Sequence, residues 1–264
     1  MGTCTKSLKR DAKAGGDIMI KTLALIRLFL YPYKNTFLSS TFNILALPIL
    51  MMVFLSLITG QSGRGAVNIL VGSLSMSIIS LCVNNLAMKI NQLTEFSGID
   101  FFMSFNVSKA QFIYGTLIAD ILVYIPGLII TLIFGSLLLG LNIDVGFYFV
   151  VFFALTVFLF VGSLRGFGAV IGFRANGVND CSAKSSALNF SLILLSPIFF
   201  STDVLPGVLR YIAQVLPTTH GATLLRMLLS GELHYNQLLI SFSVLVGYCI
   251  LNSILIKLFI KWEV

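Results

Sequence analysis

The chain has 264 residues, of which 57% are hydrophobic and only 10% are charged. A soluble domain carries roughly 25% charged residues, so this composition excludes a water-soluble globular protein and predicts an integral membrane protein. The formal net charge of +7 does not by itself indicate nucleic-acid binding, because the position of the basic residues decides what they meet.

The first 35 residues are too polar to cross a membrane. Residues 1–17 contain no apolar core that ends in a small-residue cleavage site, so they are predicted as a cytoplasmic tail, ordered or disordered, rather than a signal peptide. Residues 18–35 carry Lys21, Arg27 and Lys34 among apolar side chains. This mixture predicts an interfacial helix that ends near Pro32.

Six later stretches are long and apolar enough to cross a bilayer, which takes about 20 residues in a helix. The sequence therefore predicts an all-α polytopic membrane protein, with residues 18–264 forming one transmembrane domain. The fourth stretch has glycines at small-xxx-small spacing, which predicts close helix packing. The predicted spans are residues 37–59, 66–88, 112–139, 147–173, 185–202 and 238–259.

A polar stretch, residues 89–111, separates the second and third predicted spans. Its polar side chains follow a helical spacing, and apolar side chains follow the same spacing one face away, which predicts a helix lying in a membrane surface. Two interpretations stay open here: an ordinary amphipathic connection, or a contact surface for a cytoplasmic motor. The polar face consists of Ser97, Asp100, Ser104 and Ser108, and the apolar face of Phe96, Ile99, Met103 and Val107.

Residues 204–231 are apolar but broken by Pro206, Gly207, Pro217 and Gly221. Irregular backbone is tolerated at membrane depth only where protein or a water-filled cavity shields it. The pattern predicts a hairpin of two short re-entrant or interfacial helices, about 206–216 and 218–230, between the fifth and sixth spans.

Six crossings would place both ends of the chain on one side of the membrane. Of the 17 lysines and arginines, all but Arg64, Arg210 and Arg226 fall on that side, and Arg165 is counted among them. Basic residues concentrate in cytoplasmic segments, so both termini are predicted to be cytoplasmic. The expected location is a prokaryotic-type cell (inner) membrane. Basic charge beside anionic lipid headgroups removes nucleic acid as a predicted partner.

The sequence shows no motif for catalysis. It has no G-x-x-x-x-G-K-[ST], H-E-x-x-H or G-x-S-x-G pattern, and its four cysteines have no metal or redox spacing. The two histidines, His220 and His234, are better explained by interfacial hydrogen bonds than by a metal. We therefore expect no catalytic residue, metal or cofactor in this chain.

Polar residues inside the predicted spans have two explanations each. Asp120 would cost about 2.5–3.5 kcal/mol at the centre of a bilayer, and no partner for it is visible at that depth, so a structural or gating role is favoured over proton coupling. Ser77, Asn84 and Asn85 in the second span either bond across helices or line a polar path.

The order of these elements resembles the membrane-spanning subunit of type-two ABC exporters. This group includes drug-resistance, polysaccharide and teichoic-acid permeases and, more distantly, the G-subfamily sterol and drug exporters. The resemblance covers nearly all of residues 18–264. Its most specific part is residues 196–200 (SPIFF) with Leu205 and Pro206, followed by Pro217, Arg226 and Gly231.

The resemblance implies that residues 89–111 dock on a separate ATPase. The implied coupling residues are Glu95, Phe96, Gly98, Ile99, Asp100 and Phe101. The segment departs from the family pattern, because its basic residues are only Lys89 and Lys109 and it has no proline. The implied outer-hairpin residues are Leu205, Pro206, Pro217 and Arg226.

The resemblance also implies the partners and the activity. Two ATPase subunits would bind ATP and magnesium, and a second membrane subunit would complete a homodimer or heterodimer. The expected activity is export of a lipophilic or amphipathic substrate; the alternatives are export of a polysaccharide or lipid-linked glycan, a secondary transporter, or a membrane-embedded transferase. The expected substrate path is lined by Ser77, Asn84, Asn85, Asn189, Pro197 and Phe199.

Overall fold

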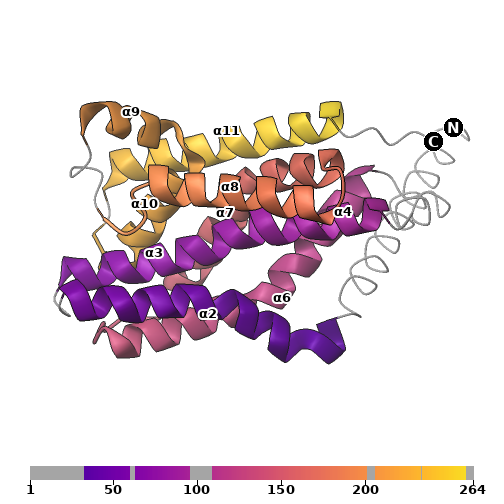
Figure 1. Ribbon diagram of the computed structural model, residues 1–264. Coiled ribbons are helices and arrows are strands. Elements are labelled where there is room, and N and C mark those ends of the chain that lie inside the picture. The colour runs from indigo at the N-terminus through magenta and orange to yellow at the C-terminus, as the bar shows by residue number, and fades with distance from the viewer. Residues whose placement is uncertain (1–32, 60–62, 96–108, 201–205, 233, 260–264) are drawn as a thin grey trace, which may run out of the picture.

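The computed structural model describes residues 33–59, 63–95, 109–200, 206–232 and 234–259, and all regular secondary structure in these ranges is helical (Figure 1). The helices are α2 (Tyr33–Thr59), α3 (Arg64–Ser80), the π-helix η1 (Leu81–Asn85), α4 (Leu86–Glu95), α6 (Lys109–Leu138), α7 (Phe147–Arg174), α8 (Val178–Leu195), α9 (Gly207–Val215), α10 (Pro217–Ser230) and α11 (Tyr235–Phe259).

Within the described residues, 4 helices are long and apolar enough to cross a membrane. A shorter apolar helix, Leu45–Ile58, lies within α2. The expectation of an all-helical polytopic membrane protein is therefore confirmed, while the number of six crossings stays a prediction. The four candidate spans are Gly65–Glu95, Ile118–Leu138, Phe147–Arg174 and Tyr235–Ile256.

The long helices run side by side between two ends of the molecule (Figure 1). We call the end that holds α9 and the start of α11 the hairpin end, and the opposite end the α4 end. α3, η1 and α4 form one continuous rod, against which α7, α8 and α6 pack, with α2 and α10 beside α3. The rod is the centre of the protein: fully buried side chains on it and on α7 include Leu70, Leu74, Phe160 and Leu164.

Two glycines of α7 let this helix lie directly on the rod. A Cβ atom on Gly172 would stand 2.6 Å from the carbonyl oxygen of Ala87, and one on Gly168 would meet the carbonyl oxygen of Cys82. Both neighbours are backbone atoms, so a side chain at either glycine would push the helices apart. The close packing predicted from the glycine spacing is confirmed here.

The second predicted span is longer than the sequence indicated. The rod runs on to Glu95, so residues 89–95 continue it instead of lying in a membrane surface, and residues 109–111 already belong to α6. The physical reason is that polar side chains in this part of α4 find partners on neighbouring helices. Residues 96–108, the rest of the predicted coupling segment, lie outside the described residues, as does the predicted interfacial helix up to Pro32.

The fifth predicted span is shifted by about two turns. The sequence indicated residues 185–202, whereas α8 covers Val178–Leu195 and is not among the four candidate spans. Pro197 disfavours helical backbone at the residue before it, and Ser196 is extended with φ −101 and ψ 133. At the other end, Asp180 and Lys184 form an ion pair one turn apart, which stabilises the first turns of the helix.

The helices of the predicted hairpin are confirmed. α9 and α10 begin and end within one residue of the predicted bounds. Pro217 is the first residue of α10, where a missing backbone N–H removes no helical hydrogen bond. Their depth in a membrane stays a prediction.

Candidate coupling site and its polar network

An ion pair joins the two helices on either side of residues 96–108. The Nζ atom of Lys89 on α4 lies 2.7 Å from Oδ1 of Asp120 on α6, and the two side chains are 20% and 11% exposed. A carboxylate in an apolar helix is costly without a partner, and this lysine supplies one. The expectation that Asp120 has no partner at depth is wrong, because Lys89 belongs to the rod and not to a connection outside the spans.

Arg165 holds α6 to α7. This arginine is only 4% exposed, and its Nη2 atom donates a hydrogen bond of 2.6 Å to the hydroxyl of Thr116 on α6. The expectation that Arg165 faces the cytoplasm with the other basic residues is corrected by the structure, because Arg165 lies inside α7 and is buried between helices. Its position within a long apolar stretch was the available signal, because a permanently charged guanidinium there needs polar partners.

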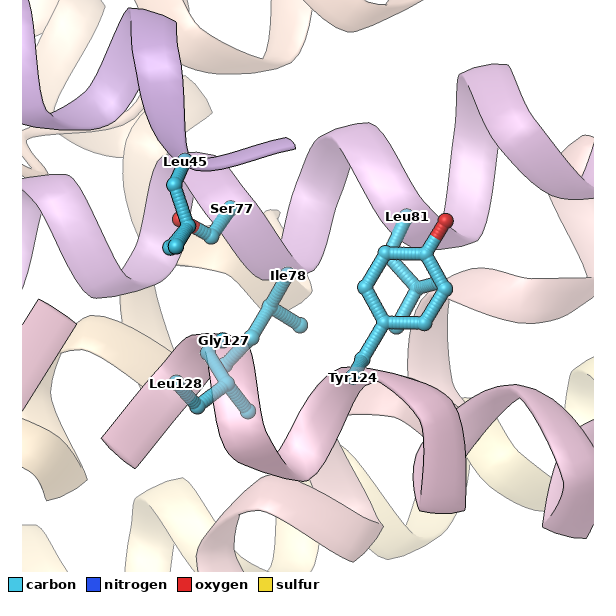
Figure 2. Close-up of a pocket in the computed structure, with 7 residues that line it drawn as sticks. All are labelled: Leu45, Ser77, Ile78, Leu81, Tyr124, Gly127 and Leu128. Atoms are coloured by element: carbon cyan, nitrogen blue, oxygen red, sulfur yellow. The ribbon is translucent and has the colours of Figure 1, made fainter. Parts of the chain in front are cut away.

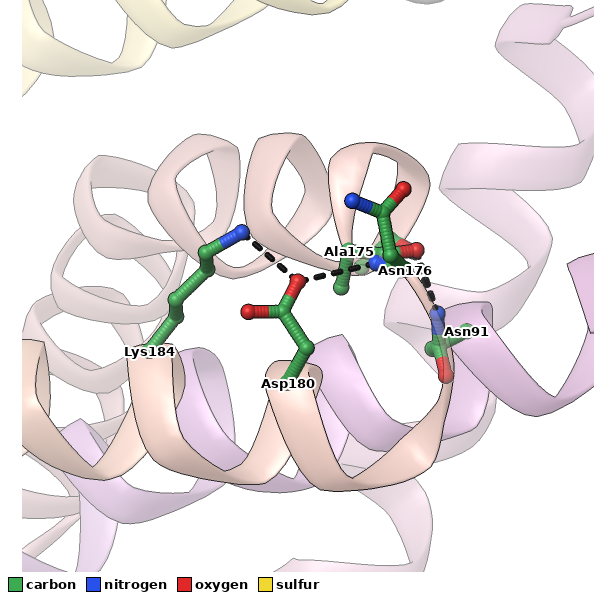
Figure 3. Close-up of polar contacts among 6 residues, drawn as sticks. Asn91, Ala175, Asn176, Asp180 and Lys184 are labelled. Atoms are coloured by element: carbon green, nitrogen blue, oxygen red, sulfur yellow. Dashed lines mark hydrogen bonds and ion pairs between the residues drawn. The ribbon is translucent and has the colours of Figure 1, made fainter.

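Asn91 ties α4 to the connection between α7 and α8 (Figure 3). Its side-chain amide donates to the carbonyl oxygens of Gly172 and Ala175, at 3.3 and 3.2 Å. Just beyond, the carboxylate of Asp180 accepts from Lys184 at 2.6 Å and from the backbone N–H of Asn176 at 2.9 Å. The hydrogen bond from Lys184, followed by that from Asn176, lowers the pKa of Asp180 below its ordinary value.

The π-helix η1 presents two asparagines to different neighbours. The Asn84 side-chain oxygen accepts from the Ser185 hydroxyl on α8 at 2.6 Å, and the Asn85 amide donates to the Tyr124 hydroxyl on α6 at 2.9 Å. On α8, Asn189 donates to Ser80 at 3.2 Å. A π turn holds one extra residue and often occurs at functional sites. These three predicted path residues therefore form bonds between helices in this structure.

Ser77 and its surroundings do not form a substrate-sized space. Its hydroxyl donates to the carbonyl of Ser73 on the same helix, at 3.0 Å. Figure 2 shows the cavity beside it, about 10 Å³ in volume, which is roughly the space of one water molecule. The cavity is lined by Leu45, Ser77, Ile78, Leu81, Tyr124, Gly127 and Leu128.

Arg226 anchors the hairpin end. Its Nε atom donates to the Asn68 side chain on α3 at 2.6 Å. Its Nη2 atom donates to three backbone carbonyls in the break after α8, those of Pro197, Ile198 and Phe200, at 3.2 to 3.4 Å. One guanidinium thus connects α10, α3 and the chain that follows α8.

The other predicted hairpin and path residues lie close to this anchor. Pro197 is buried, and the Phe199 ring packs against Gly72 of α3, where it fills the place that a Cβ atom would take. The hydroxyls of Ser196 and Thr218 form a buried hydrogen bond between the same break and α10. Pro206 is the residue that precedes α9, and Leu205 lies outside the described residues.

Of the six predicted coupling residues, Glu95 is described: it is the last residue of α4, and its side chain is exposed. The other five, Phe96, Gly98, Ile99, Asp100 and Phe101, lie outside the described residues. Their role in docking stays a prediction.

The fold and the polar network define a polytopic membrane protein that is built around one buried rod, with a separate anchored hairpin. The sequence model of the family described as ABC-2 type transporter matches residues 23–229, which is more than half of the chain. The protein belongs to this ABC-2 type transporter family and is a membrane permease. The resemblance seen in the sequence is confirmed.

One curated relative is the daunorubicin resistance ABC transporter permease protein DrrB1 of Streptomyces coeruleorubidus. The two chains are 33% identical over 117 residues. The alignment covers 44% of this chain and 41% of the relative, so the match spans less than half the length of that protein.

Proposed function

We propose that this chain is the membrane-spanning subunit of an ATP-driven exporter of lipophilic or amphipathic molecules. A separate ABC ATPase would bind ATP and magnesium and hydrolyse the nucleotide, and this chain would move the substrate out of the cytoplasm or the inner leaflet. Membership of the ABC-2 type family supports the permease role. The name of the daunorubicin-resistance relative supports a drug-like substrate over a polysaccharide or lipid-linked glycan.

The single observation that carries a coupling role is the ion pair between Lys89 and Asp120. It joins the helix that enters the predicted coupling segment to the helix that leaves it. Asn91 and Arg165 then connect these two helices to α7. Polar contacts are strong in a low-dielectric interior. A force applied at residues 96–108 would therefore move α4 and the neighbouring ends of α6 and α7 as one unit.

The same proposal includes six crossings with the α4 end in the cytoplasm. α2, the rod, α6, α7, α8 and α11 would be the crossing helices, and the excess of basic residues supports the orientation. Two copies, or this chain and a second permease, would form the core with two ATPases. α9 and α10 would then lie at the outer surface.

The proposed substrate path follows the rod and α8. Asn84, Asn85 and Asn189 are bonded between helices in this structure, so they would contact a substrate only when those bonds exchange partners. Such an exchange would accompany the change between inward and outward states. Phe199 and Pro197 would lie at the end of this path, beside the Arg226 anchor.

Docking on the ATPase is the step to test first. The double variant Glu95→Ala/Phe96→Ala should still accumulate in the membrane but co-purify poorly with the candidate ABC ATPase. Loss of a packed phenylalanine at an interface costs about 2 kcal/mol or more, which corresponds to roughly thirtyfold weaker binding. The matched control is Ser182→Ala, an exposed position on α8 that lies outside residues 89–111 and should leave ATPase docking unchanged.

The readouts are the dissociation constant of the ATPase and substrate-stimulated ATP hydrolysis in proteoliposomes. Drug-like compounds should stimulate hydrolysis by the wild-type complex and not by the Glu95/Phe96 variant. Wild-type docking and stimulation in the double variant would show that residues 89–111 are an ordinary connection. Stimulation only by a lipid-linked glycan would replace the drug-like substrate with the polymer alternative.

A further inference from the structure

An open groove lies where the end of α9, α10 and α11 meet. Its volume is about 380 Å³. Sites for small molecules span roughly 300–1,000 Å³, so the groove has the size of a ligand site, unlike the small cavity beside Ser77. It is lined by Gln214, Thr219, His220, Thr223, Gln237, Ile240, Ser241 and Val244.

The polar lining of the groove is a set of amides, hydroxyls and one imidazole, without a carboxylate, lysine or arginine. The Nε2 atom of His220 lies 2.8 Å from the carbonyl oxygen of Gln214, and because a carbonyl only accepts, Nε2 carries the proton. The Nδ1 atom of the same ring is hydrogen-bonded to the Ser241 hydroxyl at 3.2 Å. These two bonds hold α9, α10 and α11 together, and they fix the walls of the groove.

One hydroxyl in the lining has unused hydrogen-bonding capacity. Thr219 is only 4% exposed, and its Oγ1 atom has no hydrogen-bond partner among the described residues. A buried hydroxyl without a partner is unfavourable. Because this Oγ1 atom is itself shielded from the groove, it reaches a ligand hydroxyl, ether or carbonyl only after the Thr219 side chain rotates.

The surface beside the groove is apolar. Leu239 and Ile240 on α11 are 63% and 58% exposed, and Val215 at the end of α9 is 65% exposed. Exposed apolar side chains of this kind on a membrane-spanning helix are suited to contact with lipid tails. A neutral polar groove next to a lipid-facing surface fits a molecule with an uncharged polar head and an apolar tail.

We propose that this groove binds the uncharged polar head of an amphiphile, with the tail lying along Ile240 and Val244 of α11. The binding chemistry is hydrogen bonding to hydroxyl, ether or carbonyl oxygens. The source of the amphiphile is either a membrane lipid or an exported molecule; the second role rests on the proposed function, in which the groove lies on the outer side and receives the substrate as it leaves.

The test uses a photoactivatable octyl glucoside with a diazirine in its alkyl chain. The permease is placed in phosphatidylcholine nanodiscs without ATPase or ATP, so that failed transport cannot affect the result. Mass spectrometry should find the label on α10 and α11 at the groove. Thr223→Leu, which fills the groove, should reduce labelling about tenfold, the effect expected from losing one or two hydrogen bonds.

The matched control is Ser243→Leu. Ser243 lies on α11, is exposed, and bonds to the carbonyl of Leu239 in its own helix. It should label like the wild type. Gln237→Leu, at an exposed lining position, provides a second groove variant if Thr223→Leu does not fold.

Competition then distinguishes the two sources. An unlabelled glycosyl diacylglycerol that displaces the probe identifies a lipid site, and displacement by compounds that stimulate ATP hydrolysis identifies a substrate site. The proposal is overturned if Thr223→Leu and Gln237→Leu label like Ser243→Leu. Equal labelling of the groove by a diazirine alkyl phosphocholine, whose head is charged, would also overturn it.

Discussion

The rod formed by α3, η1 and α4 and the last helix, α11, are both apolar enough to cross a membrane, yet they have opposite surroundings. In its most apolar 18-residue stretch, 89% of the rod's residues are buried inside the protein, whereas only 17% are buried in the corresponding stretch of α11. The rod contains Ser73, Ser75 and Ser77, all buried, whereas Leu239 and Ile250 of α11 are exposed. Apolarity thus places a helix in the membrane, and small and polar residues place it inside the protein.

The physical basis of this difference is the absence of a hydrophobic drive between helices in lipid. Helices there associate through close packing and interhelical hydrogen bonds. The rod has both, with α7 glycines on its backbone and asparagines bonded to α6 and α8. α11 packs mainly against α7 and α10, where the Asn252 amide donates to the carbonyl of Ser163.

The largest expected effect comes from breaking the ion pair on the rod. Lys89→Met leaves Asp120 mostly buried without this lysine, which should destabilise the protein by about 3 kcal/mol. The double variant Lys89→Met/Asp120→Leu should recover most of the loss, because an apolar pair of similar volume replaces two charges. Thermal unfolding in nanodiscs measures both.

The matched control for this pair is Lys184→Met. Lys184 pairs with Asp180 at the surface, where the side chains are 52% and 32% exposed, so its loss should cost less than about 1 kcal/mol. If Lys89→Met and Lys184→Met destabilise the protein equally, the ion pair on the rod contributes no more than a surface contact. The contrast between the buried rod and the exposed α11 would then not include a contribution from buried charge.

The next largest expected effect distinguishes the rod from α11 by close packing alone. Gly168→Ala on α7 forces a methyl group against the rod's backbone and should destabilise the protein by about 2 kcal/mol. Gly247→Ala on α11 has nothing within 4 Å of the added atom and should be neutral or slightly stabilising. Unfolding temperature and yield in the membrane fraction report the difference, and equal behaviour of the two variants would remove close packing as the reason for the rod's burial.

Helix existence was predictable from the sequence, because long apolar stretches have no other stable form in lipid. The broken hairpin was predictable too, since Pro206 and Pro217 fix where α9 and α10 begin. The residues at which helices begin and end near the α4 end of the molecule could not be predicted from the sequence. Lys89 and Asn91 look like surface residues until their partners on α6 and α7 are known, so the rod's last two turns were assigned to a separate helix.

The candidate site was less predictable than the fold for the same reason. A sequence indicates that Asp120 and Arg165 need partners, but the identity of each partner depends on which helices lie side by side. The serines and asparagines of the second span could either bond across helices or line a polar path, and only the geometry decides between the two. Asn84 bonds to α8 and Asn85 to α6, although they are adjacent in the chain. The coupling residues from 96 to 101 lie outside the described residues, so their assignment stays a prediction.

The smallest expected effect lies at the surface of the α4 end, where Asp180 accepts hydrogen bonds from Lys184 and Asn176. These bonds hold the pKa of Asp180 below its ordinary value of 3.8. A lowered folded-state pKa means that the charged form stabilises the fold at all pH values above 3.8, and that this contribution disappears as the pH falls through the lowered pKa. The contribution of Asp180 to stability therefore changes with pH only in acid, and it is constant near neutral pH.

Asp180→Asn should lower the unfolding temperature by no more than about 2 °C between pH 5 and pH 8, because the group is exposed and solvent screens it. The gap between variant and wild type should stay constant over that range and close below pH 3.8. Lys184→Met, measured in parallel, should show the same pH dependence, since it removes the first of the two donors. A gap that widens in acid, or one as large as that of Lys89→Met, would mean that the α7–α8 connection contributes to the rod's stability as strongly as the buried contacts do.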